Sequence, residues 1–197
     1  MRVLIIGGSG TIGKAIADAF TGNHDVITAS RTSGDHRVDI SDKASIEALF
    51  REVGPVDAVV SAAGSAAWKP VTELTDEDFQ FSLSNKLMGQ INIARVALSH
   101  LTEGGSITLT SGILSRNPAP GSAAVSLVNA GLEGFVRAAA LDLPRGIRIN
   151  VVSPPWVSET LEQMGSDPSA GLPARQVAEA YRESVEGTAT GQVIDAR

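Results

Sequence analysis

A glycine-rich turn near the amino terminus constrains the fold of this chain more than any other feature. The segment Gly7-Gly8-Ser9-Gly10-Thr11-Ile12-Gly13 directly follows the apolar run Val3–Ile6. It leads into Lys14–Phe20, where apolar residues recur with helical spacing. A strand, a glycine turn and a helix in this order are typical of the first unit of a dinucleotide-binding sheet.

The three spaced glycines have separate physical roles in such a unit. Gly7 suits a tight turn off the strand, Gly10 a close approach of backbone to phosphate, and Gly13 close packing of the helix against the strand. The free backbone N–H groups at the helix start then face an anion. An ordinary strand-to-helix turn rich in glycine is the alternative. We expect the whole loop to contact a cofactor, including Ser9, Thr11 and Ile12.

Composition and charge narrow the class of protein. The chain has 197 residues, 43% hydrophobic and 19% charged, which fits one globular domain over residues 1–197. Its net charge of -6 argues against nucleic acid or an anionic membrane as a partner. It contains no cysteine, which excludes disulfides and thiolate catalysis. We expect no metal site, signal peptide or membrane span, and therefore a cytoplasmic protein.

Short β-branched runs alternate with longer helical patterns along the chain, which predicts a parallel sheet with helices on both faces. The predicted strands are Arg2–Ile6, Asp25–Ala29, Arg37–Ile40, Val56–Ala62, Ser106–Thr110, Arg148–Val152 and Gln192–Ile194. The predicted helices are Lys14–Phe20, Asp42–Glu52, Asp76–His100, Ser122–Leu141 and Pro173–Glu186. The fold class is therefore α/β, a doubly wound Rossmann-type sheet of about seven strands.

Several further segments carry a family resemblance. They are Val38-Asp39-Ile40, Ser61-Ala62-Ala63-Gly64, Gly105-Ser106-Ile107-Thr108-Leu109-Thr110-Ser111 and Arg145-Gly146-Ile147-Arg148-Ile149-Asn150-Val151-Val152-Ser153-Pro154. With the glycine loop, they make the chain resemble the short-chain dehydrogenase/reductase (SDR) family over essentially its whole length. The resemblance implies a nicotinamide cofactor lying across the carboxyl ends of the strands.

The chain departs from this family at the catalytic pair. The family uses Tyr-x-x-x-Lys on the helix after the fifth strand, and the corresponding positions here are Val125 and Asn129. Valine has no proton to exchange with a carbonyl oxygen. The only tyrosine of the chain is Tyr181, which we expect to pack or cap at the surface of the last helix.

Two residues are candidates to replace the missing groups. Ser111, at the end of the fifth strand, is one residue before Gly112, the position that strict family spacing gives to the active-site serine. Lys86 occupies the place of the family's asparagine, with Asn85 beside it. We expect Ser111 to orient a carbonyl and Lys86, or a bound water, to handle the proton. A strand-end turn for Ser111 and a solvated helix face for Lys86 are equally open interpretations.

Cofactor preference is predicted at the end of the second strand. A guanidinium and a hydroxyl, Arg31 and Ser30, stand where an NAD-binding chain usually carries an acid. They suit a 2′-phosphate, so we expect NADP(H) rather than NAD(H), unless Arg31 is merely a solvated surface residue. The resemblance places Asp39 by the adenine. The other expected contacts are Ile40, Ala62, Ala63, Gly64, Pro154 and Val157.

The chain is also short for this family. Only residues 32–37 separate Arg31 from the third strand, which leaves no room for a helix there. Residues 158–172, where the family builds a substrate lid, are also few, so we expect a shallow site with a mobile loop. Small side chains on the helix after the fifth strand, with the family's habit of pairing helices across a two-fold axis, predict a homodimer or homotetramer.

Two functions remain open from the sequence. The first is an NADP(H)-dependent oxidoreductase that acts on a small carbonyl or alcohol compound, of unknown identity, with non-standard catalytic residues. The second is a catalytically inactive protein that binds NADP(H) as a sensor or interaction partner.

Overall fold

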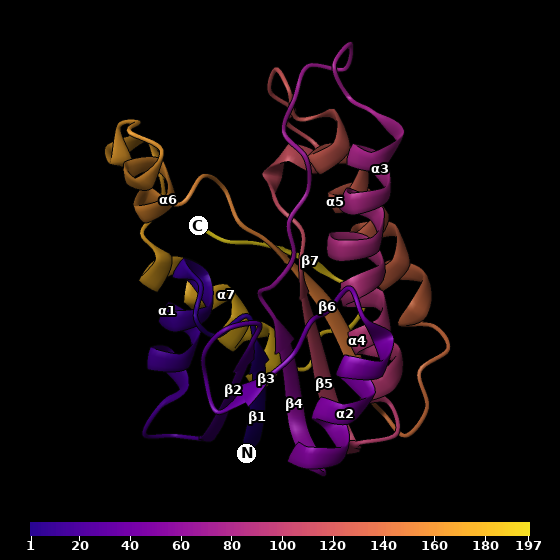
Figure 1. The fold of residues 1–197 in the computed structure, drawn as a ribbon. Helices are drawn as coiled ribbons and strands as arrows, with labels where there is room; N and C mark the ends of the chain where they lie inside the picture. The colour runs from indigo at the N-terminus through magenta and orange to yellow at the C-terminus, as the bar shows by residue number, and fades with distance from the viewer.

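The computed structural model describes residues 1–197 and forms one seven-stranded parallel sheet with helices on both faces (Figure 1). The strands stand in the order β3-β2-β1-β4-β5-β6-β7. Their bounds are β1 Arg2–Ile6, β2 Asp25–Ser30, β3 His36–Arg37, β4 Val56–Ser61, β5 Leu101–Thr110, β6 Arg148–Ser153 and β7 Val193–Asp195. The predicted fold class is confirmed.

The helices lie in two layers (Figure 1). α1 and α7 cover one face of the sheet, while α2, α4 and α5 cover the other. The α-helices are α1 Thr11–Phe20, α2 Lys43–Val53, α3 Asp76–Ser82, α4 Gly89–Ala97, α5 Ala123–Ala139, α6 Ser158–Gln163 and α7 Ala174–Glu186. All of them are too short or too polar to span a lipid bilayer.

Strand β1 shows how the sequence fills both layers. Val3 and Ile5 pack into the cluster of α1 and α7, which contains Tyr181. Leu4 and Ile6 pack into the cluster on the opposite face. All four side chains are fully buried. A central strand of a parallel sheet has to be apolar on both faces, so it reads as a continuous apolar run.

The point where the sheet changes direction fixes the place of the site. β1 pairs with β2 on one side and with β4 on the other, both in parallel register. The connections that leave β1 and β4 therefore run to opposite sides and open a crevice at the carboxyl ends of these strands. The glycine loop lies at this point.

The third strand is shorter than the predicted Arg37–Ile40. Its pairing with β2 involves only His36 and Arg37. The chain then turns, because the Asp39 carboxylate accepts hydrogen bonds from the Ser41 N–H at 2.9 Å and the Ser41 hydroxyl at 2.6 Å. This local turn leads into α2, whose first turn Asp42 caps. As predicted, no helix joins β2 to β3.

The predicted helix over Asp76–His100 is divided into three parts. α3 starts at a capping box formed by Thr75 and Asp78. A π-helical segment, Leu83–Met88, then separates α3 from α4. A π-turn adds one residue to the helix and changes which side chains face the sheet, a feature often found at functional sites. Sequence periodicity alone did not reveal this insertion.

The connection over residues 158–172 is made of short elements, and the mobility expected of it stays a prediction. It contains α6 and a 3-10 turn at Pro168–Ala170. Its two ends meet in a parallel bridge between Val157 and Leu172. Both carboxylate oxygens of Glu159 also accept hydrogen bonds from the Ala174 N–H, at 3.1 and 2.9 Å, and so join α6 to the start of α7.

Candidate functional site

The glycine loop packs so tightly that side chains are excluded at two of its positions. Gly7 has a φ of +90°, and a Cβ placed on it would lie 2.7 Å from the carbonyl carbon of Ala62. A Cβ on Gly13 would lie 2.0 Å from the carbonyl oxygen of Gly7. Both neighbours are backbone atoms that cannot move aside. These two glycines therefore join β1, β4 and α1 at the predicted point.

The third glycine of the pattern faces open space. A Cβ on Gly10 would meet only the Gly7 carbonyl oxygen, at an ordinary 3.5 Å. Gly10 is the N-cap of α1 and supplies no side-chain cap. The first N–H groups of α1 thus remain available to an anion, as they must if a pyrophosphate binds there.

A cleft of about 500 Å³ opens beside this loop. Ten of the predicted cofactor residues line it: Gly7, Ser9, Gly10, Ser30, Arg31, Asp39, Ile40, Ala62, Ala63 and Gly64. Thr11 lines a neighbouring polar hollow over α1 and α7. Ile12, Gly13, Pro154 and Val157 line neither space. The cleft follows the end of the sheet from β3 to β4.

The end of β2 presents one free cation to the cleft. The Ser30 hydroxyl is buried and donates to the Ser33 carbonyl oxygen at 2.5 Å, so it is engaged within the turn. Arg31 is exposed, and the ion pairs of the chain do not involve it. Hydrogen bonds from Ser41, with a smaller effect of the Arg31 charge, lower the pKa of the Asp39 carboxyl.

Lys86 lies on the π-helical segment against the loop that follows β4. A Cβ on Gly64 would come within 3.0 Å of the Lys86 Cα, so the glycine lets the loop cross the helix here. The Lys86 Nζ donates a long hydrogen bond of 3.5 Å to the backbone carbonyl of Ser111. Although the residue as a whole is only partly buried, the protein shields its amine from water and lowers the pKa of Lys86 to about 8.

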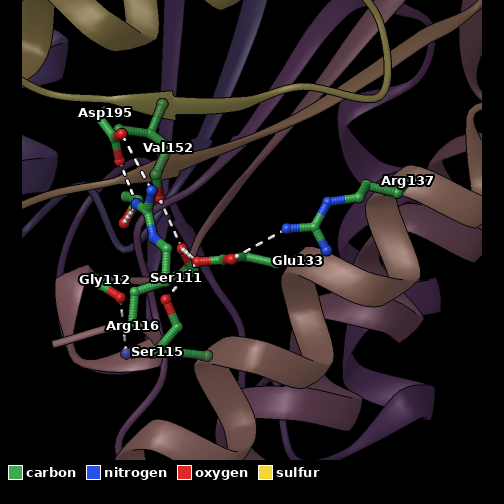
Figure 2. Close-up of polar contacts among 10 residues, drawn as sticks. Ser111, Gly112, Ser115, Arg116, Glu133, Arg137, Val152 and Asp195 are labelled. Atoms are coloured by element: carbon green, nitrogen blue, oxygen red, sulfur yellow. Dashed lines mark hydrogen bonds and ion pairs between the residues drawn. The ribbon is translucent and has the colours of Figure 1, made fainter. Parts of the chain in front are cut away.

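Ser111 has a different role from the predicted one (Figure 2). Its hydroxyl is buried and donates to Glu133 Oε1 at 3.2 Å. Ser115 donates to the same oxygen at 2.5 Å, and Arg137 donates to Oε2 at 3.3 Å. Because the hydroxyl belongs to this cluster around Glu133, the backbone carbonyl of Ser111 is the group that meets Lys86. The expectation that the hydroxyl orients a substrate carbonyl is corrected accordingly.

The positions of the family's catalytic pair hold an apolar group and a neutral amide. Val125 lies in the first turn of α5 and is half-buried. Asn129 is buried, and its Nδ2 donates to the Gly112 carbonyl at 3.4 Å. Its Oδ1 is buried without a hydrogen-bond partner in the chain. A buried acceptor left without a partner is the kind of atom that a ligand hydroxyl or a water satisfies.

Tyr181 is a core residue, so the expectation that it packs or caps at the surface is wrong. The side chain is fully buried, and its hydroxyl lies 2.7 Å from the Thr110 Oγ1. Burial raises the pKa of the Tyr181 phenol to well above its ordinary value of 10. It cannot replace the missing catalytic tyrosine, because it faces the cluster between α7 and the sheet.

Phe81, at this edge of the sheet, was missed by sequence reasoning, whereas Asn85 was noted only as the neighbour of Lys86. Phe81 and Asn85, one helical turn apart, line the cleft. The Asn85 Oδ1 accepts a hydrogen bond from the Ser65 N–H at 2.8 Å and so holds the loop after β4. Phe81 stays 47% exposed, an unusual state for a phenylalanine, and its apolar character on a polar helix was the available signal. No group of acidic and histidine side chains is arranged to hold a metal ion.

Comparisons with known sequences agree with this geometry. The family described as enoyl-(acyl carrier protein) reductase matches residues 15–194. The short-chain dehydrogenase/reductase ATR9 of Stachybotrys chlorohalonatus is 31% identical, over 98% of this chain and 94% of its own length. The hydroxynaphthalene reductase arp2 of Aspergillus fumigatus is 34% identical over 64% of this chain, and the match spans only 48% of that reductase.

Solved structures show the same fold. The protein lin1944 from Listeria innocua superposes with a TM-score of 0.96 and is 41% identical, over the full length of both chains. A small-chain dehydrogenase in complex with NADPH superposes with a TM-score of 0.87. It is 28% identical over 99% of this chain and 95% of its own.

Proposed function

Because the chain belongs to the short-chain dehydrogenase/reductase family, we propose that it is an NADP(H)-dependent oxidoreductase for small carbonyl or alcohol compounds, with Lys86 as its proton carrier. The observation that carries this proposal is the cleft itself, which ten of the predicted cofactor residues line. The cleft combines a glycine turn closed to side chains with an uncapped helix start. Together these form a site for a dinucleotide pyrophosphate.

NADP(H) differs from NAD(H) by a 2′-phosphate, and the cleft contains a group that suits this phosphate. Arg31 lines the cleft with a guanidinium free of ion pairs, and no acid stands at the end of β2 to repel a phosphate. A guanidinium forms charge-assisted hydrogen bonds to phosphate. The NADPH complex of the related small-chain dehydrogenase supports the same choice.

Lys86 holds and moves the proton in this proposal. When bound, the nicotinamide exchanges a hydride with the carbonyl carbon of the substrate. In reduction, the Lys86 ammonium gives its proton to the carbonyl oxygen, and the neutral amine regains a proton from water. In oxidation, the neutral amine takes the proton of the alcohol. A pKa of about 8 keeps both forms accessible near neutral pH.

Neighbouring groups set the position of this amine. The Ser111 carbonyl accepts a hydrogen bond from it, and the Glu133 cluster fixes Ser111 (Figure 2). Asn129 Oδ1 is buried and unpartnered in the chain, which supports a role as acceptor for a ligand hydroxyl or a water in this proposal. Asn129 stands at the position of the family's lysine, Ser111 is one residue before that of its serine, and Lys86 stands at that of its asparagine.

Binding without turnover is the second candidate function. Val125 favours it, since this position provides the family's proton donor and valine provides none. The orientation of the Ser111 hydroxyl toward Glu133 also favours it. In that case the chain is an NADP(H) sensor or interaction partner, and the predicted pairing of helices into a homodimer or homotetramer carries its function.

One experiment distinguishes the two candidates. NADPH oxidation is followed by its absorbance against aldehydes, ketones, quinones and enones, with NADPH binding measured in parallel. We expect turnover in the wild type and its loss in Lys86→Met, with Lys43→Met as the control at an exposed lysine on α2. Tight NADPH binding without turnover on any compound overturns the oxidoreductase proposal and supports the sensor.

A further inference from the structure

The two tryptophans of the chain meet at the carboxyl edge of the sheet, although they are 88 positions apart in the sequence. Trp68 lies in the connection after β4, and Trp156 lies in the connection after β6. Their ring centroids are 5.8 Å apart, and the ring planes are tilted by 55°. Aromatic rings at this separation attract each other through their edges and faces.

Trp68 is held in place by the backbone on both sides of it. The Ala67 N–H donates to the Ser82 hydroxyl at 2.9 Å, and the Lys69 N–H donates to the Gly121 carbonyl at 3.0 Å. Gly121 has a φ of +84°, and a Cβ there would lie 2.8 Å from the indole Nε1. The indole therefore rests directly against the turn that begins α5.

Trp68 is nevertheless not covered by the protein. Trp68 remains 44% exposed, whereas an aromatic residue that only stabilises the fold is usually well buried. Its anchoring is strong for an exposed loop residue, since Lys69 also pairs with Asp78 at 2.8 Å. A large apolar ring that is rigidly held and partly open is typical of a ligand-binding wall.

The connections that carry the two tryptophans also contact the segment before α5, the helix with the positions of the family's catalytic pair. Trp156 follows Pro154, whose carbonyl accepts a hydrogen bond from the Ile113 N–H at 2.9 Å. A Cβ on Gly112 would lie 3.9 Å from the same carbonyl and 3.0 Å from Asn129 Nδ2. On the other side, Trp68 contacts Gly121, one helical turn before Val125. Val125 puts an apolar side chain at the position where the family has a tyrosine.

We propose that the substrate is a flat aromatic carbonyl compound, which stacks against the Trp68–Trp156 pair with its carbonyl directed toward the Lys86 end of the site. This proposal rests on the proposed function, because it names the substrate class of the same site. The indole faces provide the stacking surface, and Val125 fills the side that a phenol would otherwise occupy. The reaction remains hydride transfer to the carbonyl carbon and protonation of its oxygen.

Two ketones with the same carbon skeleton test this directly. 1-Tetralone carries a fused benzene ring, and 1-decalone is its saturated counterpart, so they differ mainly in aromaticity. Each is titrated into the NADP⁺ complex by calorimetry, and its reduction by NADPH is followed in parallel. We expect 1-tetralone to bind at least tenfold more tightly, a difference of about 1.4 kcal/mol. Trp68→Leu should reduce this affinity ratio nearly to one, and Trp68→Phe should retain most of it. Leu141→Ala, an exposed position just beyond the far end of α5, should leave the ratio unchanged.

The chain contains its own spectroscopic reporter of this contact. Its two indole N–H groups give two signals in a proton–nitrogen correlation spectrum, and a stacked aromatic ring shifts both. We expect 1-tetralone to shift both signals and 1-decalone to shift them much less.

The outcomes keep the two proposals apart. Failure of NADPH to bind overturns the proposed function. NADPH binding with equal affinities for the two ketones, or with unmoved indole signals, overturns the aromatic substrate class alone. Selective binding of 1-tetralone without turnover of any compound overturns the proposed function, and leaves the tryptophan pair as a binding surface for an aromatic ligand.

Discussion

The two ends of the candidate site differ in which parts of the chain form them, backbone at one end and side chains at the other. The cofactor end is organised by backbone around Gly7, Gly10 and Gly13, with the Arg31 side chain at its edge. The reacting end is formed by the side chains of Lys86, Asn129 and the Glu133 cluster. The first end keeps the pattern of the SDR family, and the second departs from it at both positions of the Tyr-x-x-x-Lys pair.

The proposed role of Lys86 gives this difference a physical reason. A backbone cradle fails with one added Cβ, because no rotamer can relieve a clash with a carbonyl oxygen. A proton carrier, in contrast, can come from another element that reaches the same place. Lys86 comes from the helix after β4, whereas the family's pair comes from the helix after β5.

Replacing Gly13 by alanine should produce the largest loss of cofactor binding and stability among these variants, through a change at the cofactor end of the site. Its Cβ would lie 2.0 Å from the Gly7 carbonyl oxygen, so α1 must move away from β1. We expect loss of NADPH binding and roughly 3 kcal/mol or more of unfolding free energy. Gly134→Ala is the control, because its Cβ meets no atom within 4 Å and alanine favours helix. NADPH titration measures the binding, and thermal unfolding measures the stability. Tight NADPH binding by Gly13→Ala would contradict the close contact between Gly13 and Gly7.

The pH dependence of turnover tests the reacting end. Desolvation lowers the pKa of Lys86 to about 8, so its ammonium form dominates below that pH and is lost above it. Carbonyl reduction should therefore fall as pH rises through about 8, and alcohol oxidation should rise over the same range. Lys86→Met should remove this dependence and slow turnover by about 10² to 10⁴. An unchanged pH profile in Lys86→Met would exclude this lysine as the proton carrier.

Charge reversal at Arg31 probes cofactor choice without touching the reacting end. Arg31→Glu should weaken NADPH binding by about 10- to 100-fold, the value of a charge-assisted hydrogen bond to phosphate, and affect NADH much less. Arg37→Glu is the control, since this exposed arginine on β3 does not line the cleft. Equal losses of NADPH affinity in Arg31→Glu and Arg37→Glu would show a general effect of net charge and would contradict a direct contact of Arg31 with the phosphate.

Removal of the Glu133 carboxylate should affect stability and leave the cofactor end intact. Glu133 is 3% exposed and receives hydrogen bonds from Ser111 and Ser115. Glu133→Ala leaves these buried donors without an acceptor, which should cost about 1–3 kcal/mol of unfolding free energy. Glu47→Ala, at an exposed pair with Lys43, should change it by less than about 1 kcal/mol. A parallel loss of NADPH affinity in Glu133→Ala would show that the two ends are coupled.

Ten of the residues predicted to bind the cofactor line one cleft, and these residues could be chosen from local sequence features. The strand, glycine turn and helix are local features, and their apolar periods and turn residues are set by neighbours in the chain. The fold class of the sheet and the short link from β2 to β3 followed from the same local reasoning.

The reacting end was predictable only in part. Lys86 was identified from its position, but the π-helical segment that orients it depends on packing against Gly64 and the sheet. The Ser111 hydroxyl turns toward Glu133, 22 positions later, because a buried carboxylate needs donors from wherever the fold provides them. Trp68 and Trp156 meet only through tertiary structure, so no spacing in the sequence predicts their contact.

Titration of the wild-type chain with NADPH and NADH, followed by nicotinamide fluorescence, tests the central claim most directly. The cleft beside the glycine loop, with Arg31 at its edge, predicts saturable binding of NADPH and binding of NADH at least tenfold weaker. Binding of NADH as tight as that of NADPH, or no binding of either, would contradict it.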